Sequence, residues 1–211
     1  MVALLALLLF MPFALEGVWQ RNVLSLLATF TFVGGIRAVS STKLHLIVGT
    51  ALAIPPFIVQ WLSSLSRWED PIFLLPSFYS LPFYIFLGYL VIRYIFQSGP
   101  VTIDRLFAAI CFYLLMGVFW THCYVIIENL SPGAFSFASG EYTGYTLFSK
   151  LAYFSYVTLT TLGYGDTTPV SPYAQSLAIL EAIIGVLFLA TLVARLAGIF
   201  SPFGNKEESS R

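Results

Sequence analysis

Long stretches without charged side chains restrict most strongly what this chain can fold into. Residues 44–66 carry no formal charge over 23 residues, and residues 106–127 contain no Asp, Glu, Lys or Arg. A helix needs about 20 predominantly apolar residues to cross the hydrocarbon core of a bilayer. Only 9% of all residues are charged, whereas a soluble domain has about a quarter. The sequence therefore predicts an all-α membrane protein with several spans.

The apolar stretches predict six transmembrane helices and one shorter helix that enters the membrane without crossing it. Residues 147–159 are too short to span, so we expect a re-entrant helix there. Residues 1–19 have two alternative interpretations, a signal peptide or a part of a longer N-terminus. The predicted spans cover residues 1–19, 23–39, 44–66, 71–97, 106–127 and 171–200.

The positions of the basic residues predict which side of the membrane each loop faces. With six spans and both termini in the cytoplasm, seven of the ten Lys and Arg residues lie on the inner side. Membrane proteins keep an excess of Lys and Arg on the cytoplasmic side. The loop that follows residue 159 is therefore expected to face outward. The formal net charge is zero, so nothing indicates a nucleic-acid partner.

A glycine-containing motif follows the predicted re-entrant helix and precedes the last span. Residues 160–166 read Thr-Thr-Leu-Gly-Tyr-Gly-Asp. Glycine adopts positive φ angles that other residues avoid, and here Gly163 and Gly165 alternate with larger residues. Such alternation can turn successive carbonyl oxygens to the same side of the chain. A row of backbone oxygens is a binding site for a dehydrated cation.

These seven residues resemble the selectivity filter of the potassium channel family, although Leu162 stands where Val or Ile is commoner. The resemblance covers residues 104–200. It implies a homotetramer, because one filter segment supplies only a quarter of each ring of oxygens. It also implies the following roles: the carbonyls of Thr161, Leu162, Gly163 and Tyr164 bind K+, the Thr161 hydroxyl adds the innermost ring, and Gly165 and Asp166 shape the outer mouth.

The resemblance also divides the chain and assigns residues that support the filter. Residues 1–100 would be a four-helix N-terminal transmembrane region, residues 101–200 the pore domain, and residues 201–211 a short cytoplasmic tail. The C-terminal end of the re-entrant pore helix carries roughly half a negative charge, which stabilises a cation in the central cavity. The expected supporting residues are Tyr153 and Phe154, which would brace Tyr164, together with Thr160 and Glu181.

Glu181 is the most unusual residue of the last span, because an acid inside a membrane is costly and indicates a function. The predicted pore lining is one helical stripe, made of Val186, Leu189, Val193 and Ala197. At about 100° per residue, Glu181 lies roughly 125° from this stripe. We therefore expect its side chain to point at protein and to hydrogen-bond the pore helix through Ser155 or Tyr156.

Gly185 lies in the middle of the last span and has two interpretations. By resemblance it is a gating hinge. Alternatively it permits close packing, since small residues are favoured where membrane helices meet.

The expected function is passive and potassium-selective conduction through a homotetrameric pore in the plasma membrane. The filter would face outward, membrane lipids would surround the protein, and no cofactor is expected besides K+ ions in the filter. We expect no enzymatic activity, because His45 and His122 have no evident catalytic partners in the sequence. Strong voltage gating is not expected either, because residues 71–92 contain no Lys or Arg.

Two other transport functions are weighed against this one. A non-selective cation channel would usually lack the filter tyrosine, which is present here as Tyr164. A potassium-uptake transporter would resemble four fused pore units with one filter glycine each, whereas this chain has one unit with two glycines. The gating stimulus, the protonation of Glu181 and the lipid dependence are not readable from the sequence.

Overall fold

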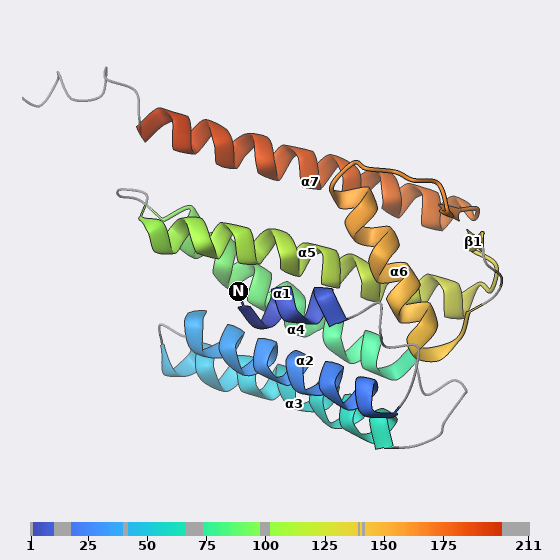
Figure 1. Ribbon diagram of the computed structural model, residues 1–211. Coiled ribbons are helices and arrows are strands. Elements are labelled where there is room, and N and C mark those ends of the chain that lie inside the picture. Colours follow the sequence, from blue (N-terminus) through green and yellow to red (C-terminus); the bar gives the residue numbers. More distant parts are fainter. Residues whose placement is uncertain are drawn as a thin grey trace, which may run out of the picture.

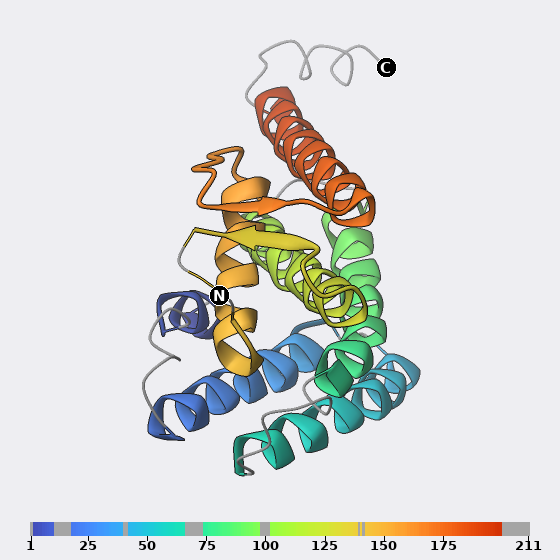
Figure 2. The same ribbon diagram turned by 90° about the vertical axis from the view of Figure 1, so that its right-hand side faces the viewer.

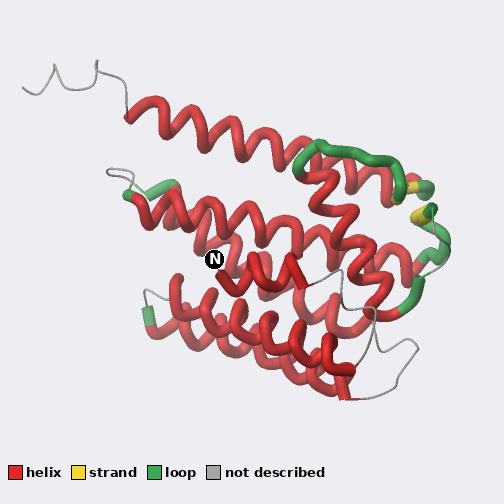
Figure 3. Tube along the Cα trace, in the orientation of Figure 1, coloured by secondary structure: helices red, strands yellow, loops and turns green. Residues whose placement is uncertain are grey.

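The computed structural model describes residues 2–10, 18–39, 42–65, 74–97, 102–138, 140 and 142–199, and these are almost entirely helical (Figure 1 and Figure 3). Two short strands form an antiparallel pair near one end of the helices. The elements in order are α1 (Val2–Phe10), α2 (Val18–Val39), α3 (Lys43–Leu65), α4 (Leu74–Ile95), α5 (Ile103–Leu130), β1 (Phe135–Phe137), α6 (Gly144–Leu159), β2 (Thr167–Pro169) and α7 (Pro172–Ile199).

The long helices run side by side in alternating directions, and α6 crosses them obliquely (Figure 1). Helices α2 and α3 lie on the opposite side of α4 and α5 from α7. The view turned by 90° shows α6 and the strand pair gathered beside α5 and α7 (Figure 2). The N-terminal helices therefore pack onto the C-terminal part of the chain through α4 and α5.

Four of the described helices are long and apolar enough to cross a membrane. They are α3, α4, α5 and α7, and they coincide with four of the six predicted spans. Helix α2 has 22 residues, but only the stretch Ser25–Gly35 within it is apolar overall. Its first two turns contain Gln20, Arg21 and Asn22, which lower its hydropathy.

The prediction of a first span over residues 1–19 corresponds to a much shorter element. Helix α1 has nine residues, which at 1.5 Å per residue reach roughly 13 Å, less than half of the roughly 30 Å of a hydrocarbon core. Residues 11–17 lie outside the described residues. The structure therefore supports four membrane-crossing helices by length and composition, and the six-span count stays a prediction.

The division of the chain into three regions also stays a prediction. The predicted break at Ser98-Gly99-Pro100 and the predicted tail over residues 201–211 lie outside the described residues. The predicted pore helix over residues 147–159 is present as α6, which begins three residues earlier and ends at the same residue.

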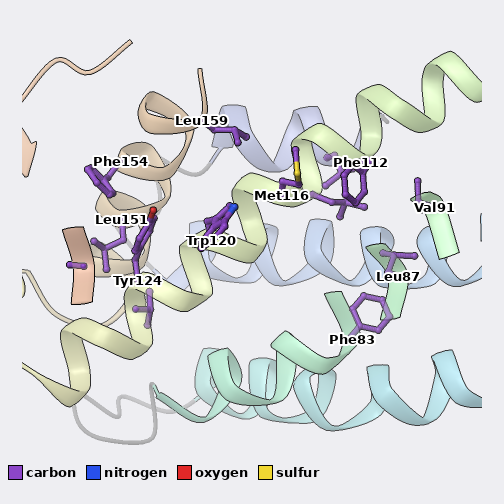
Figure 4. Packing of buried hydrophobic residues seen from close by; sticks show 14 of the residues in the cluster. Phe83, Leu87, Val91, Phe112, Met116, Trp120, Tyr124, Leu151, Phe154 and Leu159 are labelled. Atoms are coloured by element: carbon purple, nitrogen blue, oxygen red, sulfur yellow. The ribbon is translucent and has the colours of Figure 1, made fainter. Parts of the chain in front are cut away.

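The buried core connects the N-terminal helices to α6 and α7. Aromatic and aliphatic side chains from α4 and α5 form one continuous cluster with residues of α6 (Figure 4). Phe83 of α4 and Tyr124 of α5 are fully buried in it, as is Leu151 of α6. Because close-packed cores change shape little, this cluster fixes the position of α6 relative to the other helices.

Candidate functional site

The C-terminal end of α6 is held by several hydrogen bonds. The amide of Thr160 donates to the carbonyl oxygen of Tyr156 at 3.0 Å, and the Thr160 hydroxyl donates to the same oxygen at 2.6 Å. The Tyr113 hydroxyl of α5 donates to the carbonyl oxygen of Leu159 at 2.9 Å. The carbonyls at a helix end have no partner within the helix, so Tyr113 fixes the point from which the filter motif leaves.

The backbone of the motif alternates between left-handed and ordinary conformations. Thr161, Gly163 and Gly165 have φ angles of 58°, 57° and 79°. Leu162 and Tyr164 between them do not have positive φ angles. A non-glycine residue with positive φ is uncommon, and Thr161 is the only one among the described residues. This alternation is the pattern that the sequence analysis expects for a row of carbonyls facing one side.

Two peptide groups of the motif have a defined orientation. The amides of Leu162 and Gly163 both point at the carbonyl oxygen of Val157, with N···O distances of 2.8 Å and 3.4 Å. In a trans peptide the N–H and C=O groups point in opposite directions. The carbonyls of Thr161 and Leu162, which belong to the same two peptide groups, therefore point away from α6. Two amides of the filter motif thus tie it to the pore helix, and the carbonyl oxygens of Thr161 and Leu162 point away from that helix.

The motif lies on the surface of the single chain. The side chains of Leu162 and Tyr164 are 56% and 66% exposed. No heavy atom lies within 4 Å of a Cβ placed on Gly163 or Gly165. Within the described residues, no hydrogen bond is donated to the carbonyl oxygens of residues 161–164. The oxygens are therefore available to something outside this chain.

Tyr153 and Asp166 support the outer part of the motif. The Tyr153 ring stacks on the Tyr164 ring at 6.5 Å with an interplanar angle of 3°. The Tyr153 side chain also interacts electrostatically with the side chain of Asp166. Phe154 was expected to share this bracing role, but its ring packs against Tyr124 and Phe135 in the core. Consecutive residues of a helix face directions about 100° apart, so one of the two faces the filter and the other the core.

The strand pair anchors the segment that follows the motif. Strands β1 and β2 are antiparallel, with Ser136 opposite Thr168. Just beyond this pair, the amide of Ala138 donates to the carbonyl oxygen of Asp166 at 2.9 Å. The Glu128 carboxylate accepts hydrogen bonds from two backbone amides of the turn that leads into β1, both at 2.9 Å. These strands cannot be predicted from the sequence, because three residues are too few to show the alternation of apolar and polar side chains that is typical of a strand.

Glu181 is fully buried between three helices. The Tyr124 hydroxyl of α5 donates to Glu181 Oε2 at 2.5 Å, and Ser155 Oγ of α6 lies 2.5 Å from Glu181 Oε1. Ser155 is one of the two partners considered from the sequence. The other, Tyr156, donates instead to the carbonyl oxygen of Leu114 at 2.6 Å. Tyr124 was missed, because nothing in the sequence of α5 relates it to a residue 57 positions away.

Helix α7 approaches the pore helix closely at Gly185. A Cβ at this position would lie 2.8 Å from Leu159 Cδ1 and 3.0 Å from the Leu159 carbonyl oxygen. A similar approach occurs at Gly117 of α5, where a Cβ would lie 2.4 Å from the Tyr156 ring. The close packing considered for Gly185 is therefore sufficient to require glycine there, and a hinge is not needed to explain it.

The predicted pore-lining residues lie on a face of α7 that is exposed in the single chain. Val186, Leu189 and Val193 are 49%, 40% and 63% exposed. The side chain of Ala197, the fourth residue of the stripe, lies outside the described ones. Neighbouring apolar residues of α7 are exposed as well, among them Ile183 and Leu187. The exposed face is thus wider than the predicted stripe, as expected of a helix that contacts other molecules on more than one side.

Arg195 joins α7 to the far end of α4. Its guanidinium donates to the carbonyl oxygens of Ile95 and Gln97, the latter at 3.2 Å, and lies over the Phe96 ring at 5.3 Å. Arg105 of α5 donates to the same Gln97 oxygen at 2.9 Å. A helix C-terminus carries a partial negative charge and attracts cations. The two arginines therefore clamp the end of α4 to the helices that flank the filter.

Comparisons with known proteins concern the same C-terminal region. Residues 106–201 match the family model described as an ion channel. The chain is 32% identical over 87 residues to the inward rectifier potassium channel Kirbac3.1 of Paramagnetospirillum magnetotacticum, which covers 41% of this chain and 25% of that protein.

A second curated relative is the potassium voltage-gated channel protein shk-1 of Caenorhabditis elegans. It is 37% identical over 79 residues, which cover 34% of this chain and 15% of that protein. The chain thus spans a quarter or less of the length of these two relatives. No solved structure matches significantly.

Proposed function

We propose that this chain, whose C-terminal region matches the ion channel family and is similar to two potassium channels, conducts K+ passively and selectively through a pore formed by four copies of itself. The matched family and both relatives are channels, so the chain is not an enzyme. Passive conduction requires a path on which K+ exchanges its hydration shell for protein oxygens of comparable strength. Residues 161–164 would provide these oxygens.

The orientation of the motif's peptide groups is the observation that carries the proposal. The amides of Leu162 and Gly163 are bonded to the carbonyl oxygen of Val157, and the carbonyls on the other side of those peptide groups accept no hydrogen bond from the described residues. Carbonyl oxygens at membrane depth without a donor are costly. Their cost is offset if they coordinate a cation. No cofactor besides K+ is needed for this function.

Assembly into a homotetramer follows from the same oxygens. One motif offers one oxygen to each ring, whereas K+ is coordinated by rings from four chains. Helix α7 supports this, because only a small part of its apolar surface is buried within the chain. Neighbouring copies would cover its inner face, and membrane lipids would cover the outer face.

The orientation proposed is the one that the basic residues favour. The start of α5 and the ends of α4 and α7 lie at the end of the bundle opposite to the strand pair (Figure 1). These helix ends carry Arg105, Arg93 and Arg195, respectively. An excess of basic residues marks the cytoplasmic side. In a plasma membrane the filter would then face outward.

Strong voltage gating is not part of the proposal. Within α4 the only basic residue is Arg93, in the last turn. Each charge that crosses the field gains about 2.3 kcal/mol per 100 mV, and steep gating needs roughly three to four charges per subunit. A conductance–voltage curve is therefore expected to require less than about one gating charge per subunit, and a steeper curve would contradict this part.

The selectivity test uses the purified full chain in planar bilayers, with potassium on one side and sodium on the other. We expect a reversal potential far from zero, on the side set by the potassium gradient. Tyr164→Ala is expected to weaken the selectivity or to abolish the current. Tyr173→Ala is the matched control, because Tyr173 is also highly exposed but lies in the first turn of α7. A reversal potential near zero for the unmodified chain would refute potassium selectivity.

A further inference from the structure

Four fully buried side chains form a continuous chain of oxygen contacts between α5, α6 and α7. Thr121 Oγ1 donates to the Gly117 carbonyl oxygen at 2.7 Å, and Ser155 Oγ donates to the same oxygen at 2.9 Å. Ser155 Oγ also lies 2.5 Å from Glu181 Oε1, and the Tyr124 hydroxyl lies 2.5 Å from Glu181 Oε2. Thr121, Tyr124, Ser155 and Glu181 are all 0% exposed. Bulk solvent therefore does not reach these contacts.

The number of hydrogens in this cluster decides the protonation of Glu181. Each of the four oxygen–oxygen contacts needs one hydrogen between its atoms. The Gly117 carbonyl can only accept, so Thr121 and Ser155 each donate their single hydroxyl hydrogen to it. Tyr124 donates its hydroxyl hydrogen to Glu181 Oε2. The remaining contact, between Ser155 and Glu181 Oε1, has a hydrogen only if the carboxyl group itself carries one.

Among the described residues, those that surround Glu181 include no positive charge that would favour a carboxylate. The titratable groups that face it are Tyr113, Cys123 and Tyr124 of α5 and Tyr156 of α6, and no basic residue is among them. No other titratable residue of α7 acts on Glu181, whose remaining close partner is the Ser155 hydroxyl. An unpaired charge in such a place is far more costly than a hydrogen-bonded neutral acid.

We propose that Glu181 is a neutral carboxylic acid in the folded channel and that it donates its proton to Ser155, so that Tyr124, Glu181 and Ser155 hold the pore helix against α5 and α7. These are positioning residues, because none of them touches the ion. Ser155 lies two residues before Val157, whose carbonyl oxygen binds two amides of the filter motif. The consequence for conduction rests on the proposed channel function, whereas the protonation itself does not.

Loss of the proton would disrupt the cluster in a defined way. Ser155 would have one hydrogen for two acceptors, and an unpaired charge would be left between three helices. The contacts are complete at low pH and are lost as the pH rises. In Glu181→Gln the amide nitrogen donates to Ser155 and the amide oxygen accepts from Tyr124. This variant reproduces the neutral acid and cannot be deprotonated.

The first experiment is infrared spectroscopy of the purified full chain at neutral pH, as a difference between the unmodified protein and Glu181→Gln. The expected result is a carbonyl stretching band of a protonated carboxyl group that the variant lacks. A second variant, Tyr124→Phe, keeps the carboxyl but removes one hydrogen bond, and should move this band to higher frequency. A difference spectrum with only a carboxylate band would overturn the inference.

The second experiment follows K+ flux into liposomes from pH 7 toward pH 10 for the unmodified chain and for Glu181→Gln. Flux through the unmodified protein should fall by roughly tenfold, since leaving a buried acceptor without its hydrogen bond costs about that factor. Flux through the variant should fall much less. Equal pH profiles would overturn the positioning role. A protonated band without any K+ flux would overturn the proposed function and leave the protonation of Glu181 standing.

Discussion

Replacing Gly185 by alanine distinguishes close packing from a hinge. The added methyl group would lie 2.8 Å from Leu159 Cδ1 and 3.0 Å from the Leu159 carbonyl oxygen. Ordinary carbon contacts have their optimum near 3.5–4.0 Å, so α7 and the end of α6 must separate by several tenths of an ångström. Overpacking of this kind costs about 1–3 kcal/mol, against a gain of about 1 kcal/mol from the better helix propensity of alanine.

The net cost is therefore about 0–2 kcal/mol for each chain, and a tetramer would carry it four times. Leu159→Ala alone removes a fully buried side chain and should cost about 2–5 kcal/mol. The double variant should lose less than the sum, because the truncated side chain leaves room for the new methyl group. We expect a favourable coupling of about 0.5–2 kcal/mol between the two positions.

The assay is thermal unfolding of the detergent-solubilised protein for the four members of this cycle, with single-channel open probability measured in parallel. Gly88→Ala is the matched control, because this α4 glycine has room for a Cβ at 3.4 Å from Phe112 and should be neutral or slightly stabilising. The packing argument would be refuted if the coupling were zero and if Gly185→Ala altered the open probability equally with Leu or Ala at position 159. That outcome would support a hinge.

Three further variants test other parts of the site. Gly163→Ala places a Cβ on a residue with a φ angle of 57°, which costs about 1–2 kcal/mol for each chain. The variant should show reduced selectivity in bi-ionic recordings. Unchanged selectivity would contradict the role of this backbone conformation. Tyr153→Phe removes the hydroxyl that interacts with Asp166 but keeps the ring stacked on Tyr164. Current should therefore decay faster in sustained recordings, and an unchanged decay would speak against this support. Arg195→Gln removes the guanidinium that donates to the carbonyls at the end of α4. The variant should have a changed open probability and an unchanged reversal potential. A shifted reversal potential would mean that the residue acts on the filter.

The sequence by itself determined the features that depend on neighbouring residues. The apolar length of α3, α4, α5 and α7 sufficed to predict membrane-crossing helices, because a span is a local property of about 20 residues. The motif at residues 160–166 indicated the alternating backbone, because glycine is the residue that tolerates positive φ. Even the end of the pore helix at Leu159 was correct, since the motif that follows cannot continue a helix.

The tertiary structure alone decided which distant residues meet. Tyr124 reaches Glu181 across 57 positions, and Tyr113 reaches the end of the pore helix across 46. The pairing of β1 with β2 also joins segments that are distant in the sequence. The ring of Phe154 packs in the core against Tyr124 of α5 rather than toward the filter. No periodic pattern encodes such contacts, because each depends on how whole helices cross. The physical reason is that hydrogen bonds and close approaches between helices are determined by distances in space, while a sequence pattern records only distances along the chain.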